Sequence, residues 1–467
     1  MRPVPRAAHD VPARVRRRPR VNAGHVALVL LAIVVIGAIV FFVTTSRPAI
    51  AATEGAPPSF PPAQLARGAQ LAAMGDCLVC HTAVDGKPYA GGRPLATPFG
   101  TLYATNITPD AETGIGRWSQ AAFTRAMREG VSRDGSHLYP AFPYDHFRLL
   151  TDDDIAALYA FMMTRRPVSA RAPRNDLYFP LGFRPLLAGW KLLFLHDDPV
   201  ATDSAQSAEL QRGAYLVQGI AHCGACHTPR NFLGAEKRDQ AFAGGEAEGW
   251  HAPALNTAAP APVPWTVDAM VTYLSAGIAP RREVAAGPMA PVTHDLSRVD
   301  PADVRAIAAY MLTQSGEPSE ARKGKAERVV ASAEGKPLLQ PTGGTSVGGG
   351  AAAGANEAAA GASIYAGACA ACHDSGRGHF FQGGLNLRLS TSVNAPTPDN
   401  LAQIVLHGIA PADGERGAWM PAFAASLTQD QLVALLSWIR AEAASEQPAW
   451  RDVAGSVRRI MKADAHR

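Results

Sequence analysis

The sequence predicts an all-α protein in which an N-terminal apolar helix precedes three tandem helical repeats. Three observations predict this architecture. An uncharged apolar run extends from Val26 to Val43, which is long enough for a membrane-spanning helix. A Cys-x-x-Cys-His frame occurs three times and contains all 6 cysteines of the chain. Each frame is followed by a capped helix, and three copies of one arrangement indicate a repeated domain.

The repeated frame has the pattern by which proteins attach c-type haem. Two thiols add to the two vinyl groups of one porphyrin, and the histidine that follows binds the iron. The spacing places the three groups on one face of a helical turn. The sequence therefore predicts three covalent haems. Their attachment residues are Cys77, Cys80, Cys223, Cys226, Cys369 and Cys372, and their iron ligands are His81, His227 and His373.

Two other chemistries also use paired cysteines. A Cys-x-x-Cys pair can act as a redox dithiol, and two such pairs can close on one zinc ion. Neither chemistry explains why every cysteine falls in one of three identical frames that end in histidine. Because c-type haem is attached outside the bacterial cytoplasm, the frames also predict an exported protein.

Length and charge fit three domains and argue against nucleic-acid binding. The 467 residues suffice for about three domains. The formal net charge is +4, but seven arginines lie among the first 20 residues, where Asp10 is the only acid. The rest of the chain is close to neutral, so we expect no basic surface for nucleic acid.

The N-terminal region predicts a membrane anchor. We expect a cytoplasmic basic tail over residues 1–24, a transmembrane helix over 25–45 and a proline-rich tether over 46–62. The arginine cluster stays in the cytoplasm, which places the remaining chain in the periplasm. The alternative is a cleaved signal peptide, since Ala49-Ile50-Ala51 resembles a cleavage site. The apolar run is longer than an ordinary signal-peptide core, which favours the retained anchor.

Each repeat is expected to contain a helix before its frame and a capped helix after it. The first helix contains a glycine that would let another helix approach closely. These glycines are Gly68, Gly213 and Gly361. The second helix begins with ordinary capping residues and carries an aromatic side chain. These aromatic residues are Tyr159, Tyr310 and Trp438.

The repeats divide the rest of the chain into six segments. They are the first repeat at 63–170, an apolar connector at 171–205, the second repeat at 206–316, a linker at 317–358, the third repeat at 359–447 and a tail at 448–467. We expect the connector to pack between the first two repeats. The glycine-rich linker should be flexible and leave the third repeat the most mobile. The tail is expected to be solvated and basic.

Two methionines are candidates for the second axial position of a haem. Haem iron that only carries electrons takes a second ligand, and methionine raises its potential. Met289 and Met420 lie 62 and 47 residues after the histidines of their frames, each beside a proline. We expect both to bind iron, although a methionine in such a loop can also be packing alone.

The first repeat departs from this pattern. Phe142 stands 61 residues after its frame histidine, where the second repeat predicts a methionine, and phenylalanine cannot bind iron. His146 is the nearest candidate ligand, with His137, Met127 and Met162 behind it. Ligation by histidine would lower the potential of this haem. An open sixth position, which would bind carbon monoxide, is the alternative.

Further motifs surround the frames and carry a family resemblance. They are Asn106 to Asp110 with Thr113 to Trp118, the loop Tyr139 to Tyr144, and Cys226 to Asn231. Here the chain resembles the three-haem, membrane-bound cytochrome c subunits of bacterial periplasmic dehydrogenases, over about residues 60–445. The variant Phe-Pro-Tyr-Asp-His-Phe that begins at Phe142 is more similar to the cytochrome partners of molybdenum hydroxylases that act on aldehydes or N-heterocycles.

The resemblance implies three tandem cytochrome c domains that carry electrons from a periplasmic dehydrogenase to ubiquinone or a terminal oxidase at the plasma membrane. The best match for the partner is a molybdenum hydroxylase. The alternatives are a quinoprotein alcohol dehydrogenase and a flavoprotein gluconate dehydrogenase. A rival of another class is a self-contained haem enzyme with a five-coordinate first haem. The sequence contains no phosphate loop or Gly-x-Gly-x-x-Gly fingerprint that would indicate other catalysis.

Overall fold

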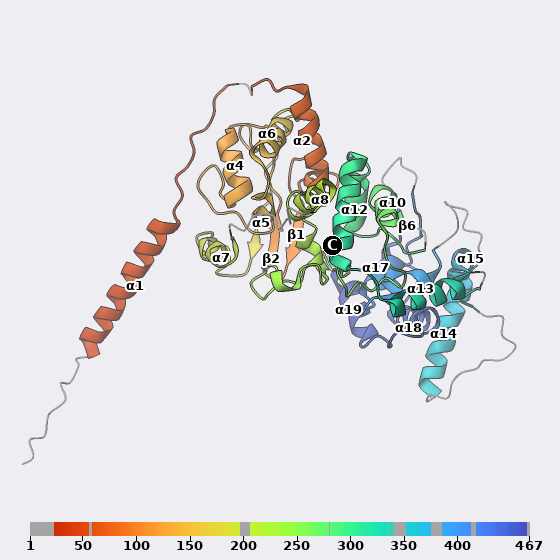
Figure 1. The fold of residues 1–467 in the computed structure, drawn as a ribbon. Helices are drawn as coiled ribbons and strands as arrows, with labels where there is room; N and C mark the ends of the chain where they lie inside the picture. The colour runs from red at the N-terminus through yellow and green to blue at the C-terminus, as the bar shows by residue number, and fades with distance from the viewer. Residues whose placement is uncertain are drawn as a thin grey trace, which may run out of the picture. The chain divides into compact units, whose positions relative to one another are not determined.

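The structure is a computed structural model that describes most of the chain. The described residues are 23–55, 58–196, 206–279, 281–334, 336–339, 352–374, 385–411 and 417–464. They form two compact units, Met1–Arg47 and Pro48–Arg467. Helices dominate both units, which confirms the predicted all-α class (Figure 1). The predicted basic tail, residues 1–24, lies almost entirely outside the described residues.

The first unit contains the predicted apolar helix. Helix α1 (Ala23–Thr45) has 23 residues, and its segment Gly24–Thr45 is long and apolar enough to cross a membrane. Its side chains are exposed almost throughout. A helix that is apolar on all sides suits an apolar environment such as a membrane or a protein core.

The second unit contains the three repeats, each built from a few helices. The first comprises α2 (Pro62–Met74), α3 (Cys77–Cys80), α4 (Gln120–Glu129), α5 (Tyr144–Phe147), α6 (Asp152–Met163) and the connector helix α7 (Leu186–Phe194). The second comprises α8 (Ala208–Gln218), α9 (Gly224–His227), η1 (Arg238–Gln240), α10 (Val267–Ala276), α11 (Met289–Leu296), α12 (Pro301–Ser315) and α13 (Glu320–Ala333). The third comprises α14 (Ala352–Ala368), α15 (Ala370–His373), η2 (Leu387–Leu389), α16 (Thr391–Asn394), α17 (Asp399–His407), α18 (Gln429–Ala443) and α19 (Val453–Asp464).

Short antiparallel strands flank the helices in the described part of the chain. They are β1 (Pro94–Thr97), β2 (Gly100–Tyr103), β3 (Asp176–Leu177), β4 (Gly245–Ala247), β5 (Trp250–Ala252), β6 (Ile278–Ala279) and β7 (Glu283–Val284). They form small sheets of order β1-β2-β3, β4-β5 and β6-β7. The strand β1 pairs with β2 in the register Pro94↔Tyr103. These hairpins are too short to form a core of their own.

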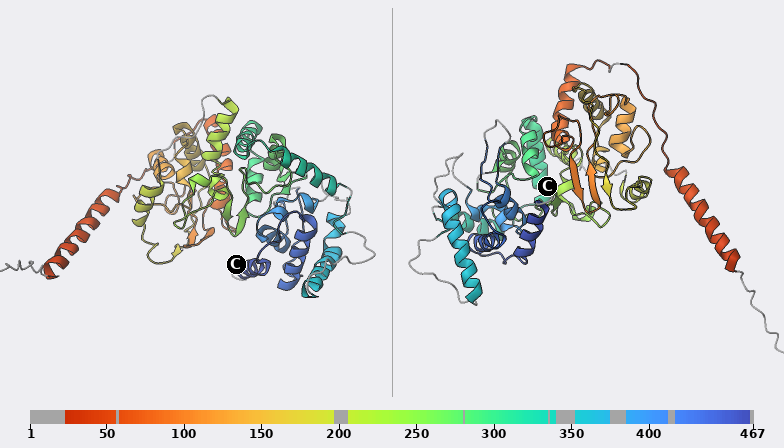
Figure 2. Two further views of the ribbon diagram at one scale, coloured as in Figure 1. Left: turned by 60° about the horizontal axis from the view of Figure 1, so that its bottom comes forward. Right: turned by 180° about the vertical axis from the view of Figure 1, so that it is seen from behind.

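Each repeat is held by one closely packed helix pair, and the predicted glycines make the contact. The pairs are α2 with α6, α8 with α12, and α14 with α18; the last pair is visible side by side in Figure 2. A Cβ atom added at the glycine would collide with a backbone carbonyl oxygen of the partner helix. The colliding pairs are Gly68 with Ala157, Gly213 with Ala306 and Gly361 with Ala434. The glycines therefore permit the close approach that the sequence predicts.

Tyr159 lies in the capped helix α6, as predicted, but the aromatic residue that contacts the glycine of the first helix pair is Phe161. A Cβ atom built on Gly213 or Gly361 would lie 2.7 or 2.6 Å from the Cβ of the aromatic residue four positions after the contacted alanine, Tyr310 or Trp438. In the first repeat this position is Phe161, at 2.7 Å from the Gly68 Cβ. Tyr159 lies on another face and donates its hydroxyl to Trp118 O at 2.8 Å.

Two segments that the sequence predicts to be loose are helical. The linker contains α13, and Arg322 in this helix donates to Ala259 O at 3.0 Å. The glycine-rich residues 340–351 of the linker lie outside the described residues. The predicted solvated tail contains α19, whose Val457 and Ile460 are buried against the third repeat. Hydrophobic burial on one helix face therefore outweighs the basic charge of this segment.

The third repeat is hydrogen-bonded to the second. This corrects the expectation that the third repeat is the most mobile. Asn400 of α17 accepts a hydrogen bond from His251 N at 2.8 Å and donates one to His251 O at 2.7 Å. The carboxylate of Glu283 accepts from Ser392 N at 2.8 Å. In each contact a side chain of one repeat bonds to the backbone of the other, so these contacts fix the two repeats against each other.

The connector contacts the first two repeats, as predicted, but does not fill a space between them. Lys191 of α7 is buried and donates to Glu129 O and Gly130 O of the first repeat at 2.7 and 2.6 Å. Trp190 donates to Leu233 O of the second repeat at 3.0 Å. The outer side of the connector remains exposed, with Phe179 98 % accessible.

Candidate haem sites

Each Cys-x-x-Cys-His frame forms one short helical turn, as its spacing predicts. In every frame the histidine N–H donates to the carbonyl of the first cysteine, four residues earlier. These bonds are His81 N to Cys77 O at 3.1 Å, His227 N to Cys223 O at 3.0 Å and His373 N to Cys369 O at 3.0 Å. An i to i+4 bond is that of an α-helical turn. Two thiols and one imidazole are thus presented together, as covalent haem attachment requires.

The ring orientation of the three frame histidines suits iron binding. Each Nδ1 lies within hydrogen-bond distance of a backbone carbonyl, which can only accept. The pairs are His81 with Thr105 O at 2.6 Å, His227 with Pro253 O at 2.7 Å and His373 with Leu385 O at 3.0 Å. The proton therefore resides on Nδ1, and the Nε2 lone pair is available to a metal. The sequence analysis missed these carbonyls, which lie 12 to 26 residues after their histidines.

Burial favours the neutral thiol at five cysteines, Cys77, Cys80, Cys223, Cys226 and Cys369. All six are described, and none forms a disulfide. Burial raises the pKa of Cys80 and Cys223 to about 12 and that of Cys369 to about 11. A redox-active dithiol needs a lowered pKa, so this environment does not suit dithiol chemistry. The same residues fit a haem, because the thiols are unpaired and stand on the turn that also carries the histidine.

The two predicted methionine ligands lie in corresponding parts of their repeats. Met289 is the first residue of α11 and packs half-buried against the core of the first two repeats. Met420 exchanges backbone hydrogen bonds with Ile409, at 3.0 and 2.8 Å, and packs against the core of the third repeat. In both repeats the methionine follows a helix that ends in a glycine with positive φ, Gly277 or Gly408.

The backbone of the first repeat places Phe142 where the second repeat has Met289. Equivalent bonds set this register: Leu138 N to Gly130 O and Ala285 N to Gly277 O, both 2.7 Å, then Phe142 N to Tyr139 O at 3.0 Å and Met289 N to Ala286 O at 3.2 Å. Both side chains pack half-buried against the same core. The structure therefore agrees with the sequence comparison that put Phe142 at the methionine position.

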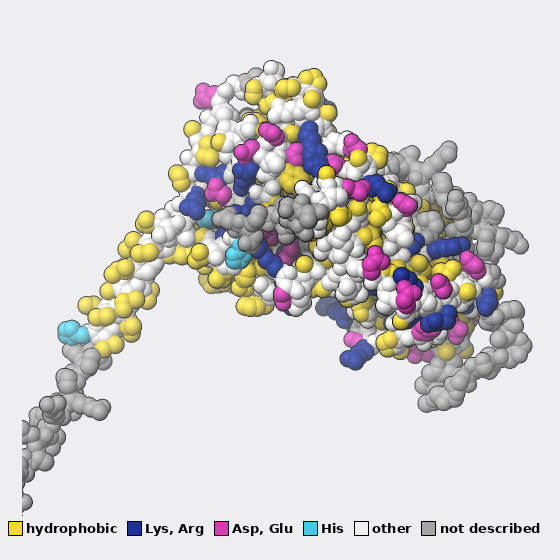
Figure 3. All heavy atoms as spheres, in the orientation of Figure 1, with side chains coloured by type: hydrophobic (Ala, Val, Ile, Leu, Met, Phe, Trp, Pro, Cys, Tyr) yellow, Lys and Arg dark blue, Asp and Glu magenta, His cyan; other side chains and the backbone are white. Residues whose placement is uncertain are grey.

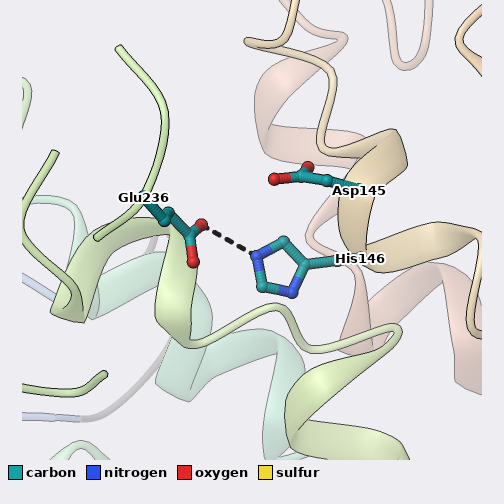
Figure 4. Close-up of side chains that lie close together, drawn as sticks. All are labelled: Asp145, His146 and Glu236. Atoms are coloured by element: carbon teal, nitrogen blue, oxygen red, sulfur yellow. Dashed lines mark hydrogen bonds and ion pairs between the residues drawn. The ribbon is translucent and has the colours of Figure 1, made fainter. Parts of the chain in front are cut away.

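The structure places His146 against the second frame rather than free beside the first. Its Nδ1 lies 2.7 Å from Gln218 O, and its Nε2 lies 2.8 Å from Glu236 Oε1 (Figure 4). A Cβ atom added at Gly224, inside the second frame, would lie 3.3 Å from the His146 ring. A ligand histidine needs one free ring nitrogen, and both are used here. Ligation of the first iron by His146 stays a prediction, and it would require one of these two bonds to break.

The other candidates for the first iron are held in the interior of the first repeat. His137 is buried, and its Nδ1 lies 3.1 Å from the Lys191 ammonium. Met127 and Met162 are buried in the hydrophobic core, where they pack as ordinary apolar side chains.

His146 is the centre of a charged cluster that joins the first two repeats. One ligand atom each from Asp145, His146 and Glu236 lie within 4.8 Å of one another. Burial lowers the pKa of His146, but the hydrogen bond to Glu236 and the charges of Glu236 and Asp145 raise it to about 9. The ring is therefore an imidazolium near neutral pH, and Glu236 is its ion-pair partner at 2.8 Å. Both of its nitrogens donate in this state, so the cluster links the repeats by charge.

The first two frames meet across an approximately two-fold symmetric interface. The residue before each first cysteine contacts the other repeat at corresponding positions. The Asp76 carboxyl lies close enough to that of Asp295, five residues before the cap of α12, to shift its pKa. His222 lies against His146, five residues before the cap of α6, with ring centroids 6.3 Å apart. Burial and the neighbouring Asp295 carboxyl raise the pKa of Asp76 to about 7.

The first helices of the two repeats make matching contacts across this interface. Gln70 of α2 accepts from Asp300 N at 2.8 Å, and Tyr215 of α8 accepts from Thr151 N at 3.1 Å. The Tyr215 hydroxyl also donates to Asp154 at 2.7 Å. Sequence reasoning missed this interface, although the segments Arg67 to Leu71 and Arg212 to Leu216 share the pattern Arg-Gly-Ala-x-Leu.

Ion pairs complete the interface in the same symmetric manner. Arg67 binds Asp154 of its own repeat with two contacts of 2.8 Å, and Arg212 binds Asp303 in the same way. Arg67 also reaches Asp303 of the other repeat at 3.5 Å. Half-buried, bidentate pairs of this kind specify orientation, because both partners must keep their geometry.

Comparison with known families agrees with these features. The family model "Cytochrome c" matches residues 65–166 and 210–315, which contain the first two frames. The family model "Cytochrome C oxidase, cbb3-type, subunit III" matches residues 356–439, which contain the third. The repeats are therefore cytochrome c domains, whose cofactor is covalent haem c.

Individual relatives indicate which kind of cytochrome c protein the chain resembles. The chain is 45% identical over 405 residues to a nicotinate dehydrogenase subunit of Pseudomonas putida, covering 86% of this chain and 32% of that protein. It is 34% identical to the fructose dehydrogenase cytochrome subunit of Gluconobacter japonicus, covering 83% of this chain and 81% of that protein. It is also 34% identical to the gluconate 2-dehydrogenase cytochrome c subunit of Pantoea cypripedii, covering 86% and 90%. The chain belongs to the family of dehydrogenase cytochrome c subunits, and it spans about a third of the nicotinate dehydrogenase subunit.

Proposed function

We propose that this chain is a membrane-anchored, periplasmic cytochrome with three haems that accepts electrons from a dehydrogenase and delivers them to ubiquinone or a terminal oxidase. The observation that carries this proposal is the identical state of the three frame histidines, each with Nδ1 bound to a carbonyl. Covalent haem supplies a one-electron carrier with a protein-tuned potential. The anchor is supported by the length and apolarity of α1.

In this proposal the chain's own residues attach, orient and tune the cofactor. The six cysteines form thioether bonds, and His81, His227 and His373 bind iron. Met289 and Met420 supply the second axial ligand of the second and third haems, which raises their potentials. The proposed domains are those predicted from the sequence, with α13 and α19 added as packed helices.

For the first haem we infer that no protein side chain fills the sixth position. Phe142 stands at the methionine position, and both nitrogens of His146 are hydrogen-bonded to Gln218 and Glu236. Carbon monoxide titration of the reduced protein tests this. The wild type and His146→Ala should each bind one equivalent per chain. If the wild type binds none and His146→Ala binds one, His146 is the ligand and this inference fails.

The proposed partner is a dehydrogenase of the molybdenum hydroxylase type. The support is the 45% identity to a nicotinate dehydrogenase subunit, against 34% to the fructose and gluconate dehydrogenase cytochromes. Nicotinate is an N-heterocycle, the substrate class expected from the loop at Phe142. A quinoprotein or flavoprotein dehydrogenase is the second candidate, because those cytochrome subunits match over four fifths or more of their length.

Purification of the full chain from detergent-solubilised membranes tests the function and the partner separately. Addition of the partner's substrate should reduce the α band of the cytochrome, and a molybdopterin subunit with a small iron–sulfur subunit should co-purify. Co-purification of a quinoprotein or flavoprotein would refute the partner but keep the electron carrier. Rapid turnover of peroxide without any dehydrogenase would refute the carrier and favour a self-contained haem enzyme.

A further inference from the structure

The connector exposes an apolar surface that the proposed electron transfer does not explain. We call it the α7 apolar face. It consists of Phe179, Phe183, Leu186, Leu192, Leu193 and Phe232, all of which are exposed. Leu192 is 84 % and Phe232 87 % accessible. Hydrophobic side chains gather at the surface around α7 (Figure 3). Exposed apolar clusters of this kind mark protein or membrane contacts.

Backbone and side-chain bonds hold these residues together as one surface. Turns at Tyr178 to Leu181, Pro180 to Phe183 and Phe183 to Leu186 carry the chain from Phe179 into α7. Trp190 of α7 donates to Leu233 O, next to Phe232. The connector and the second repeat therefore hold these apolar side chains in fixed positions relative to each other.

The first repeat also binds the residues that follow α1 in the chain. Ile50 N donates to Arg133 O at 2.8 Å, and Arg125 donates to Pro48 O at 2.7 Å. The connector is bonded to the adjoining residues: Lys191 donates to Gly130 O at 2.6 Å, and Arg184 donates to His137 O at 2.8 Å. Residues 48–50 and the α7 apolar face are therefore attached to one short segment, residues 125–137.

Chain length keeps this segment near the end of α1. Only Ser46 and Arg47 separate Thr45, the last residue of α1, from Pro48. At no more than about 3.5 Å per residue, Pro48 stays within about 10 Å of that end. If α1 spans the bilayer as proposed, the surface of that bilayer is within reach of the residues that hold α7.

We propose that the α7 apolar face lies on the lipid bilayer and inserts its side chains at the outer interface of the membrane. The proposal rests on the proposed anchoring by α1. Membrane affinity of such a face grows with the apolar area that it buries, and tryptophan and tyrosine favour the interfacial level. The half-buried Trp190 and the exposed Tyr178 lie next to residues of this face in the chain. A second membrane contact would orient the cytochrome domains relative to an acceptor in the bilayer.

Photolabelling of the full, haem-loaded chain tests the proposal. The protein is placed in phosphatidylcholine nanodiscs that contain a diazirine-bearing acyl chain, irradiated, digested and analysed by mass spectrometry. We expect label in α1 and in the peptide from Tyr178 to Phe194. Two equally apolar exposed residues serve as internal controls, Val84 at 85 % and Trp419 at 61 % exposure, and their peptides should remain unlabelled.

A matched pair of variants links the label to the face. Leu192→Gln with Leu193→Gln should lower the label in the α7 peptide by about a hundredfold and leave the α1 label unchanged, because each leucine contributes about a tenfold partition preference. Val84→Gln should change neither. Label in α1 without label in α7 would overturn the proposal and keep the anchor. Absence of label from both would refute the anchor itself. Crosslinks from α7 to a dehydrogenase subunit instead of lipid would also overturn the proposal.

Discussion

The close helix pair of the third repeat can be tested by comparing two glycines of the same helix. Helix α14 contains Gly361, which touches α18, and Gly367, which faces open space among the described residues. A Cβ atom at Gly361 would meet Ala434 O and would lie 2.6 Å from the Trp438 Cβ, whereas no described atom beyond its own helix lies within 4 Å of a Cβ at Gly367. The perturbation is therefore the same substitution, glycine to alanine, at the two positions.

The expected effects follow from two opposing contributions. Alanine in a helix is favoured over glycine by about 1 kcal/mol, and both variants receive up to this gain. At Gly361 the helices must also separate by nearly 1 Å to reach ordinary contact distance, and overpacking of this kind costs about 1–3 kcal/mol. Gly361→Ala should therefore be less stable than Gly367→Ala by about 1–3 kcal/mol.

Thermal unfolding followed by far-UV circular dichroism measures this difference. For a cooperative unit of this size, each kcal/mol shifts Tm by about 4–8 °C, so the two variants should differ by at least about 4 °C. Haem content must be equal in both, because Gly367 lies close to Cys369. Equal stabilisation by both substitutions would refute the helix contact as described.

Three further predictions concern the haem sites and the interface. Burial raises the pKa of Asp76 to about 7, with help from Asp295, from an ordinary value of 3.8. The native state therefore keeps a proton that the unfolded chain loses, and stability falls as pH rises from 4 to 7. Asp76→Asn, which tolerates the positive φ, should remove this fall and raise the free energy of unfolding at pH 8 by as much as about 4 kcal/mol, measured by urea denaturation. Met289→Ala and Met420→Ala should each bind one more equivalent of carbon monoxide than the wild type; an unchanged stoichiometry would exclude the altered methionine as a ligand. Tyr215→Phe should cost about 1–3 kcal/mol in urea unfolding, because it removes one bond to a carboxylate and one to a backbone N–H; unaltered stability would contradict the interface.

Local spacing was sufficient to predict the repeats because the chemistry is local. A cysteine pair and a histidine must share one helical turn, so their spacing in the sequence carries the information. Gly68 and Gly213 likewise contact a partner helix through their own missing side chains. The position of Phe142 followed from its distance to the frame and agrees with the hydrogen bonds of the loop.

Features that depend on another repeat could not be predicted in the same way. His146 is held by Gln218 and Glu236, 72 and 90 residues later, so its sequence neighbours give no sign that both nitrogens are used. Asp76 and His222 occupy equivalent places but differ in type, which hides the symmetry of the interface. Helix α19 was concealed by its basic residues, although Val457 and Ile460 have the spacing of a buried helical face.

Mass spectrometry of the intact mature chain tests the central claim most directly. The account predicts one polypeptide that carries the covalent mass of three haem groups, with one group on each peptide that contains a Cys-x-x-Cys-His frame. A mature chain with fewer than three attached haems, or with free thiols at Cys77, Cys223 or Cys369, would contradict it.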